Sequence, residues 1–155
     1  MSEQVFTDSA LSEVTKSFLN QFKEADGTYK YMDAIDMMMP KSSRHVIIDY
    51  NDLYDTPEIQ TIFTENPDRM FDAFARAIME ILQIRFPEYA ESIQDEIRAR
   101  LINFPSEKSL REITASTVGK IISVSGMVVR ASEVKPFAEE MVFTCGNGHL
   151  SLIHI

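Results

Sequence analysis

The sequence predicts an α+β protein, with a helical N-terminal part followed by a part built from short strands. Apolar residues recur at helical spacing in the first part, and a spacing of two replaces that pattern from residue 97 onward. Charge changes along with the pattern: residues 1–104 carry 19 acidic and 10 basic side chains, a net charge of −9, whereas residues 105–155 carry five of each. Four of the five glycines also follow residue 105. Two architectural pieces are the simplest explanation.

Length and composition exclude several classes of protein. A chain of 155 residues corresponds to one ordinary domain or two small ones. It contains no apolar run of about 18 residues, so no transmembrane helix is expected, and its first residues do not resemble a signal peptide. The single cysteine excludes an internal disulfide framework and fits a reducing, intracellular setting. The net charge of −9 excludes a uniformly basic nucleic-acid binder, but not a local basic stripe.

The first part contains two strongly amphipathic stretches. Residues 8–23 place Leu11, Val14 and Phe18 on one helical face, and Thr7, Asp8 or Ser9 can cap its start. Residues 67–85 form the second such helix, and residues 88–96 favour a further helical stretch. The β-branched and aromatic run 44–50 predicts a strand between these helices.

Two helix starts use the same arrangement of residues. Thr56-Pro57-Glu58 and Asn66-Pro67-Asp68 each provide a capping side chain, then proline at the first helical position, then an acid in the first turn. The acids Asp49, Asp52 and Asp55 lie before the first of these starts. Their spacing lacks the ligand pattern of a calcium loop, which favours a solvated acidic loop.

The second part reads as the first half of a β-barrel. Residues 97–104 alternate between apolar and polar, residues 119–132 predict a strand that Gly126 bends, and residues 141–145 predict another strand. A glycine-bent strand pair carrying basic residues suits an OB-type barrel. Cys145 and His149 follow on a glycine-rich turn and are both zinc-ligand types, but a closed site needs four ligands. A buried thiol beside an incidental histidine remains the alternative.

These motifs, in this order, resemble the N-terminal region of the minichromosome maintenance (MCM) replicative helicases. LINFP leads into SLREI, then VGKIISVSGMVVRASEVKP, then VFTC with a nearby histidine. Upstream, HVIIDYNDL and the proline-started helix after it resemble the family's first subdomain. The resemblance covers about residues 5–149. Because the chain begins without a long acidic extension, it is more similar to the archaeal, single-gene members.

The resemblance implies a helical subdomain over 1–96, the first part of an OB-fold over 97–141, and the start of a zinc-binding subdomain over 142–149. It implies zinc as a structural cofactor held by Cys145 and His149. It also implies a ring, usually a hexamer, that clamps single- or double-stranded DNA and works with other replication-fork proteins, without a membrane partner. The expected location is the cytoplasm, at the nucleoid, for an archaeal protein and the nucleus for a eukaryotic one.

Some expected parts of the family are missing from the sequence. No G-x-x-x-x-G-K-[ST] phosphate loop is present, so ATP and magnesium would belong to a separate motor domain and the chain itself is not expected to be an enzyme. The second zinc-ligand pair and the later barrel strands are missing too, which predicts a truncated chain. Residues 150–155 (LSLIHI) match one reading frame of a common transposon-based sequencing adapter, which predicts a non-native tail; a short C-terminal strand is the alternative.

Arg130 and Lys135 flank the turn after the glycine-bent strand and are the expected DNA contacts, with Lys120 as a weaker candidate. Such contacts neutralise phosphates with little preference for sequence. Two other functions remain open. One is a free-standing OB-fold and zinc protein that binds single-stranded nucleic acid. The other is a small enzyme that uses the acidic first part, which would need a cluster of carboxylates or histidines with shifted pKa values.

Overall fold

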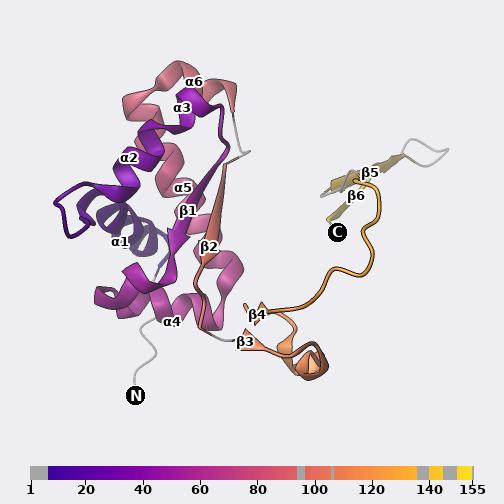
Figure 1. The fold of residues 1–155 in the computed structure, drawn as a ribbon. Helices are drawn as coiled ribbons and strands as arrows, with labels where there is room; N and C mark the ends of the chain where they lie inside the picture. The colour runs from indigo at the N-terminus through magenta and orange to yellow at the C-terminus, as the bar shows by residue number, and fades with distance from the viewer. Residues whose placement is uncertain (1–6, 94–96, 106, 136–139, 145–149, 155) are drawn as a thin grey trace. The chain divides into compact units, whose positions relative to one another are not determined.

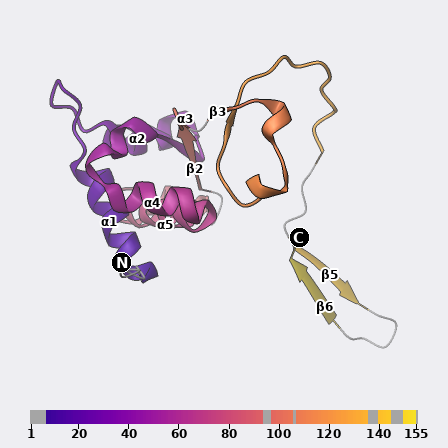
Figure 2. The same ribbon diagram turned by 90° about the horizontal axis from the view of Figure 1, so that it is seen from below.

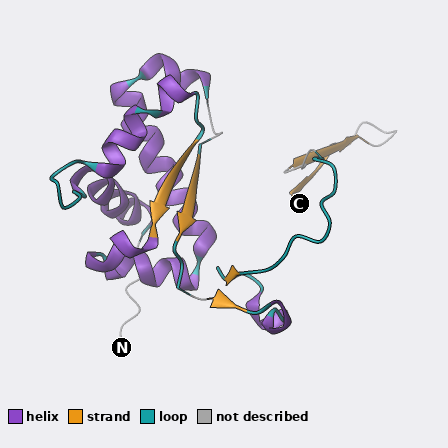
Figure 3. Ribbon diagram, in the orientation of Figure 1, coloured by secondary structure: helices purple, strands orange, loops and turns teal. Residues whose placement is uncertain are grey.

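The computed structural model describes residues 7–93, 97–105, 107–135, 140–144 and 150–154. The chain divides into two units, the first ending at Ser125 and the second beginning at Gly126. The predicted α+β class is confirmed, because helices dominate the first unit and short strands follow them (Figure 3). No helix among the described residues is both long enough and apolar enough to cross a membrane.

A central helix organises the first unit. This helix, α5 (Pro67–Arg85), packs against α1 (Asp8–Gln21), α4 (Pro57–Glu65) and α6 (Pro87–Ser92) (Figures 1 and 2). Two shorter helices, α2 (Lys30–Asp36) and α3 (Met38–Lys41), precede the first strand. Leu11, Phe63 and Phe74 lie in the core with at most 1% of their surface exposed. The apolar stripes of α1 and α5 therefore face one another, as their spacing predicts.

The helix starts are largely those that the sequence predicts. The Thr7 hydroxyl accepts a hydrogen bond from the Ala10 N–H at 3.3 Å at the start of α1. Asn66 Oδ1 accepts one from the Arg69 N–H at 3.3 Å at the start of α5. Thr56 differs, because its hydroxyl donates backward to the Leu53 carbonyl at 3.1 Å and does not cap α4. At the start of α4, the predicted arrangement is therefore present only for Pro57 and for Glu58 in the first turn.

Two parallel strands lie beside the helices of the first unit. β1 (His45–Asp49) pairs with β2 (Arg98–Ile102), with Val46 opposite Ala99 and Ile48 opposite Leu101. Val46 and Ile48 are buried, and β2 also contacts α5 (Figure 1). The alternation predicted for residues 97–104 is present, but this strand pairs within the helical unit and does not open a barrel. The sequence pattern specifies which face of β2 packs toward the core, where Ala99 and Leu101 are half-buried, and the pairing partner is set by tertiary packing.

Short elements complete the first unit. β3 (Glu107–Lys108) pairs in parallel with β4 (Ser123–Val124), and the 3-10 turns Leu110–Glu112 and Ala115–Thr117 lie between them. Ser109 and Glu112 form a reciprocal capping box, in which the Ser109 N–H donates to Glu112 Oε2 at 2.7 Å. These hydrogen bonds from Ser109 lower the pKa of the Glu112 carboxyl.

The prediction of a long strand over 119–132 is wrong in its extent. Only Ser123 and Val124 form a strand, and residues 125–135 run as a loop (Figure 3). Val128 and Val129 are 83% and 92% exposed. The reason is that a strand is stable only when it is paired, and no described strand pairs with this run.

The second unit contains an antiparallel pair, β5 (Glu140–Thr144) with β6 (Leu150–His154). The predicted strand over 141–145 is confirmed for its described residues. The C-terminal strand was the alternative for residues 150–155, and the structure forms it. The non-native origin of this tail and the domain limits at 96, 141 and 149 stay predictions.

Candidate nucleic-acid interface

The predicted DNA contacts lie on exposed segments. Arg130 and Lys135 belong to the exposed run 126–135 of the second unit. Lys120 is exposed in the first unit, where its N–H donates to the Thr117 carbonyl at 3.2 Å. Exposure leaves each cationic head accessible to a phosphate. Lys120 belongs to the first unit, and Arg130 and Lys135 belong to the second.

Exposed apolar residues flank Arg130 along the chain. Met127, Val128 and Val129 are each more than 80% exposed, and Val134 is fully exposed. A run that combines exposed cations with exposed aliphatic side chains can contact a phosphate backbone and the sugars and bases beside it. The sequence pointed to the cations of this run, but it predicted a strand over 119–132 and not an exposed loop at Val128.

The predicted zinc ligands are not tested by the structure. Cys145 and His149 lie outside the described residues. Within the part of the chain that is described, no three histidine, cysteine or acidic side chains come together to hold a metal ion. The donor set can be judged from its chemistry alone. A thiolate and an imidazole are suitable zinc ligands, but together they supply half of a closed site.

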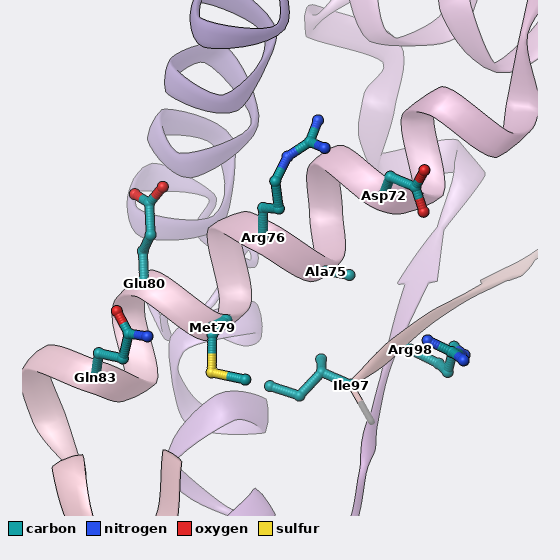
Figure 4. Close-up of a pocket in the computed structure, with 8 residues that line it drawn as sticks. All are labelled: Asp72, Ala75, Arg76, Met79, Glu80, Gln83, Ile97 and Arg98. Atoms are coloured by element: carbon teal, nitrogen blue, oxygen red, sulfur yellow. The ribbon is translucent and has the colours of Figure 1, made fainter. Parts of the chain in front are cut away.

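A hollow that the sequence did not predict lies between α5 and the start of β2. It has a volume of about 340 Å³, and Figure 4 shows Met79 and Ile97 pointing toward one another within it. Arg76 and Arg98 line it together with Asp72 and Glu80. Two cations are therefore balanced by two acids, and Glu80 also binds Lys16 at 2.6 Å. This hollow does not concentrate the positive charge that a phosphate backbone requires.

A buried tyrosine organises the acidic residues near β1. The Tyr31 hydroxyl donates to Asp52 Oδ2 at 2.5 Å and accepts from the Asp49 N–H at 3.2 Å. Burial, reinforced by the hydrogen bond to Asp52, raises the pKa of Tyr31 far above its usual range. Lys30 Nζ also donates to Asp52 Oδ2, at 2.7 Å. Burial alone would lower the pKa of Lys30, but the hydrogen bond and the charge of Asp52 outweigh it and raise that pKa.

These interactions give the acidic loop a structural role. Tyr31 keeps its proton and acts as a donor, and Asp52 accepts from two side chains at once. Asp49 Oδ1 accepts from the Asn51 N–H at 2.9 Å and so caps the 3-10 turn Tyr50–Asp55. Asp49 and Asp52 are therefore occupied by local hydrogen bonds. This arrangement does not favour the small-enzyme alternative.

Comparison with known families accounts for both parts of the chain. Residues 12–103 match the MCM N-terminal domain, and residues 109–153 match the MCM OB domain. A free-standing OB-fold protein does not account for the match over 12–103.

Curated relatives agree with the family matches. The chain is 27% identical to DNA replication licensing factor MCM7 of Arabidopsis thaliana, over 88% of the chain and 24% of that protein. It is 28% identical to DNA replication licensing factor mcm2 of Schizosaccharomyces pombe, over 84% of the chain and 16% of that protein. It is 26% identical to DNA helicase MCM8 of Gallus gallus, over 65% of the chain and 15% of that protein. The chain thus spans less than a quarter of the length of each.

Proposed function

The chain belongs to the MCM family, and we propose that it is the DNA-binding and ring-forming region of a replicative helicase. The observation that carries this proposal is the ordered match of an MCM N-terminal domain and an MCM OB domain along one chain. Both matches fall on N-terminal modules, and the sequence contains no phosphate-loop motif. DNA unwinding with ATP and magnesium would therefore require an ATPase domain in addition to these residues.

DNA binding by this region would be mainly electrostatic. Arg130, Lys135 and Lys120 would each neutralise a phosphate and release a counterion, which gives affinity with little preference for sequence. The exposure of all three side chains supports this role. The acidic remainder of the chain confines binding to such local cations, since residues 1–104 carry a net charge of −9 from 19 acids and 10 bases.

The proposal also includes the assembly of copies into a ring and the binding of a structural zinc ion. By analogy with the family, copies of the chain would associate into a ring, a hexamer in the complete protein, that encloses DNA and meets other replication-fork proteins. Cys145 and His149 would hold a structural zinc ion together with two further ligands, and the ion would contribute folding energy to its subdomain. The relatives named above are eukaryotic, and the archaeal assignment stays a prediction.

The salt dependence of DNA binding tests the proposed contacts. Affinity of the chain for a fluorescein-labelled 40-nucleotide strand would be measured by anisotropy across a series of salt concentrations. Each true phosphate contact adds about 0.7 to the slope of log affinity against log salt for single strands. Arg130→Ala should lower that slope and weaken binding equally on unrelated sequences.

Arg76→Ala is the matched control, because Arg76 is exposed on α5 beside the charge-balanced hollow. It should leave the slope unchanged. An Arg130→Ala variant whose slope equals that of the original chain would remove Arg130 from the interface. A triple variant of Lys120, Arg130 and Lys135 that still binds DNA with the original slope would refute the electrostatic interface altogether.

A further inference from the structure

A side-chain hydrogen bond joins the segment that leaves β2 to the end of β1. The ladder between the two strands ends where Asp49 lies opposite Ile102 (Figure 1). The next residue, Asn103, donates from Nδ2 to Asp49 Oδ2 at 2.8 Å. Asn103 has a φ of 57°, in the left-handed region that asparagine adopts more readily than most residues. The amide contact therefore holds the chain at the point where it turns out of β2.

An aromatic contact holds the residue that follows. The Phe104 ring lies 5.0 Å from the Tyr50 ring, measured between centroids, and the two planes cross at 81°. An edge-to-face arrangement of this kind is favourable for two aromatic rings. Both side chains are half-buried, and Tyr50 packs against the core of the first unit. We call the four residues of these two contacts, Asp49 with Asn103 and Tyr50 with Phe104, the exit latch.

The β1 side of the exit latch is fixed by the core. The Asp49 N–H donates to the hydroxyl of the fully buried Tyr31 at 3.2 Å, and Asp49 Oδ1 accepts from the Asn51 N–H at 2.9 Å. The backbone and one carboxylate oxygen of Asp49 are thus held independently of Asn103. The second oxygen is left to accept from the Asn103 amide. Because Asn103 is exposed, it is the side of the contact that can move away.

The exit latch lies at a boundary between two domains. The match to the MCM N-terminal domain ends at residue 103, and the match to the MCM OB domain begins at residue 109. β3 begins at Glu107 and pairs with β4, which lies within the OB match. With Phe104 held, only residues 105 and 106 separate the latch from β3, and the ring of Pro105 fixes its own φ. The joint between the domains is therefore short while the latch is closed.

We propose that the exit latch controls the freedom of the joint between the N-terminal domain and the OB region. While it is closed, the chain leaves β2 in one direction and the joint is confined to residues 105–106. When Asn103 and Phe104 separate from their partners, the joint extends back to residue 103. Asn103 is thus a positioning residue. The inference rests on the two domain matches and not on DNA binding, so a failure of the proposed DNA contacts leaves it unaffected.

Hydrogen exchange of the whole chain, followed by mass spectrometry, tests the latch. Asn103→Asp replaces the amide donor with a carboxylate of nearly the same shape, which repels Asp49. Peptides that cover residues 103–109 should then exchange at least about threefold faster than in the original chain. Peptides of α5 should exchange at their original rate. Asn51→Asp is the matched control, because it makes the same change at an exposed residue beside Asp49 and should leave both regions unchanged.

An exchange of the two groups separates pairing from charge. The double variant Asp49→Asn with Asn103→Asp moves the donor to β1 and the acceptor to the segment after β2. The amide at position 49 can accept from the Asn51 N–H through its oxygen and donate to the new carboxylate through its nitrogen. Exchange over 103–109 should return to within about twofold of the original rate, because the hydrogen bond is remade in the opposite direction.

Three results would overturn the proposal. Unchanged exchange over 103–109 in Asn103→Asp would show that the amide does not hold the joint. An equal acceleration in α5 would show that the contact supports the whole fold and not the joint. A double variant that exchanges as fast as Asn103→Asp, or an Asn51→Asp control that does so, would show that added charge and not a lost pairing opens the segment.

Discussion

Removing a single oxygen atom from the core gives the sharpest test of how the first unit is held together. Tyr31 is fully buried, and its ring lies 5.1 Å from the Phe18 ring and 5.3 Å from the Phe22 ring, measured between centroids. Tyr31→Phe keeps these contacts and deletes the hydroxyl. Asp52 then loses a donor, and the Asp49 N–H loses its acceptor.

The size of the effect follows from these two hydrogen bonds. A hydrogen bond to a charged group contributes about 1.5–3 kcal/mol, and an unpaired N–H adds a further cost where water cannot reach it. Asp52 retains its hydrogen bond from Lys30 at 2.7 Å, which limits the loss. We expect Tyr31→Phe to lower the free energy of unfolding by about 2 kcal/mol.

The pH dependence of the folding stability provides an independent test of the role of Tyr31. The pKa of Tyr31 is raised in the folded chain above the ordinary value of 10.0. The folded state therefore holds this proton more tightly than the unfolded state. Its contribution to stability is complete below about pH 10 and is lost as the pH rises above that value. The difference in stability between the original chain and Tyr31→Phe should shrink above pH 10, by at most about 1.4 kcal/mol per pH unit.

Urea unfolding followed by circular dichroism measures both effects. Tyr54→Phe is the matched control, because that side chain is 83% exposed and should change stability by less than about 0.5 kcal/mol. A loss below about 0.5 kcal/mol for Tyr31→Phe would refute the argument. A difference that stays constant between pH 9 and pH 11 would refute the raised pKa.

The remaining predictions concern the cap, the loop and the metal. Asn66→Ala should lower the free energy of unfolding by about 1 kcal/mol, because α5 loses its cap. Thr56→Ala should lower it by less, because the Thr56 hydroxyl does not cap α4. Equal losses in the two variants would contradict this difference between the two helix starts. Amide protons of α5 should exchange with solvent more slowly than those of 125–135, and the reverse order in hydrogen-exchange mass spectrometry would count against the helical unit as the stable part. The purified chain should bind zinc weakly at best, and stoichiometric zinc that survives dialysis against a chelator would show that the ligand set is complete.

Local signals account for the elements that the sequence predicted well. The helix α5 begins at Pro67 and ends at Arg85, as expected, because its cap and its apolar stripe both lie within the helix. The strand β1 also follows from its own composition. The capping box of Ser109 and Glu112 was missed, although its S-x-x-E spacing is readable in the sequence.

Elements that depend on distant partners were harder to predict. Alternation in residues 98–102 indicated a strand with one buried face, but no local pattern could identify β1 as its neighbour. The run 125–135 has strand composition, yet its residues stay unpaired in the described structure, so composition overestimated the length of the strand. Arg130 and Lys135 were chosen as candidate DNA contacts from their position in the motif, because the chemistry of an isolated surface cation does not distinguish it from others, and this choice stays a prediction.

The parallel pairing of β1 with β2 also constrains when the first unit can complete its fold during synthesis. The helices α4, α5 and α6 all lie between the two strands along the chain. Such a non-local pairing closes a long loop, which slows folding. The ribosome must release residues through Ile102 before the two strands can meet. Until then, the backbone of β1 remains without its neighbour and is open to pairing with other nascent chains.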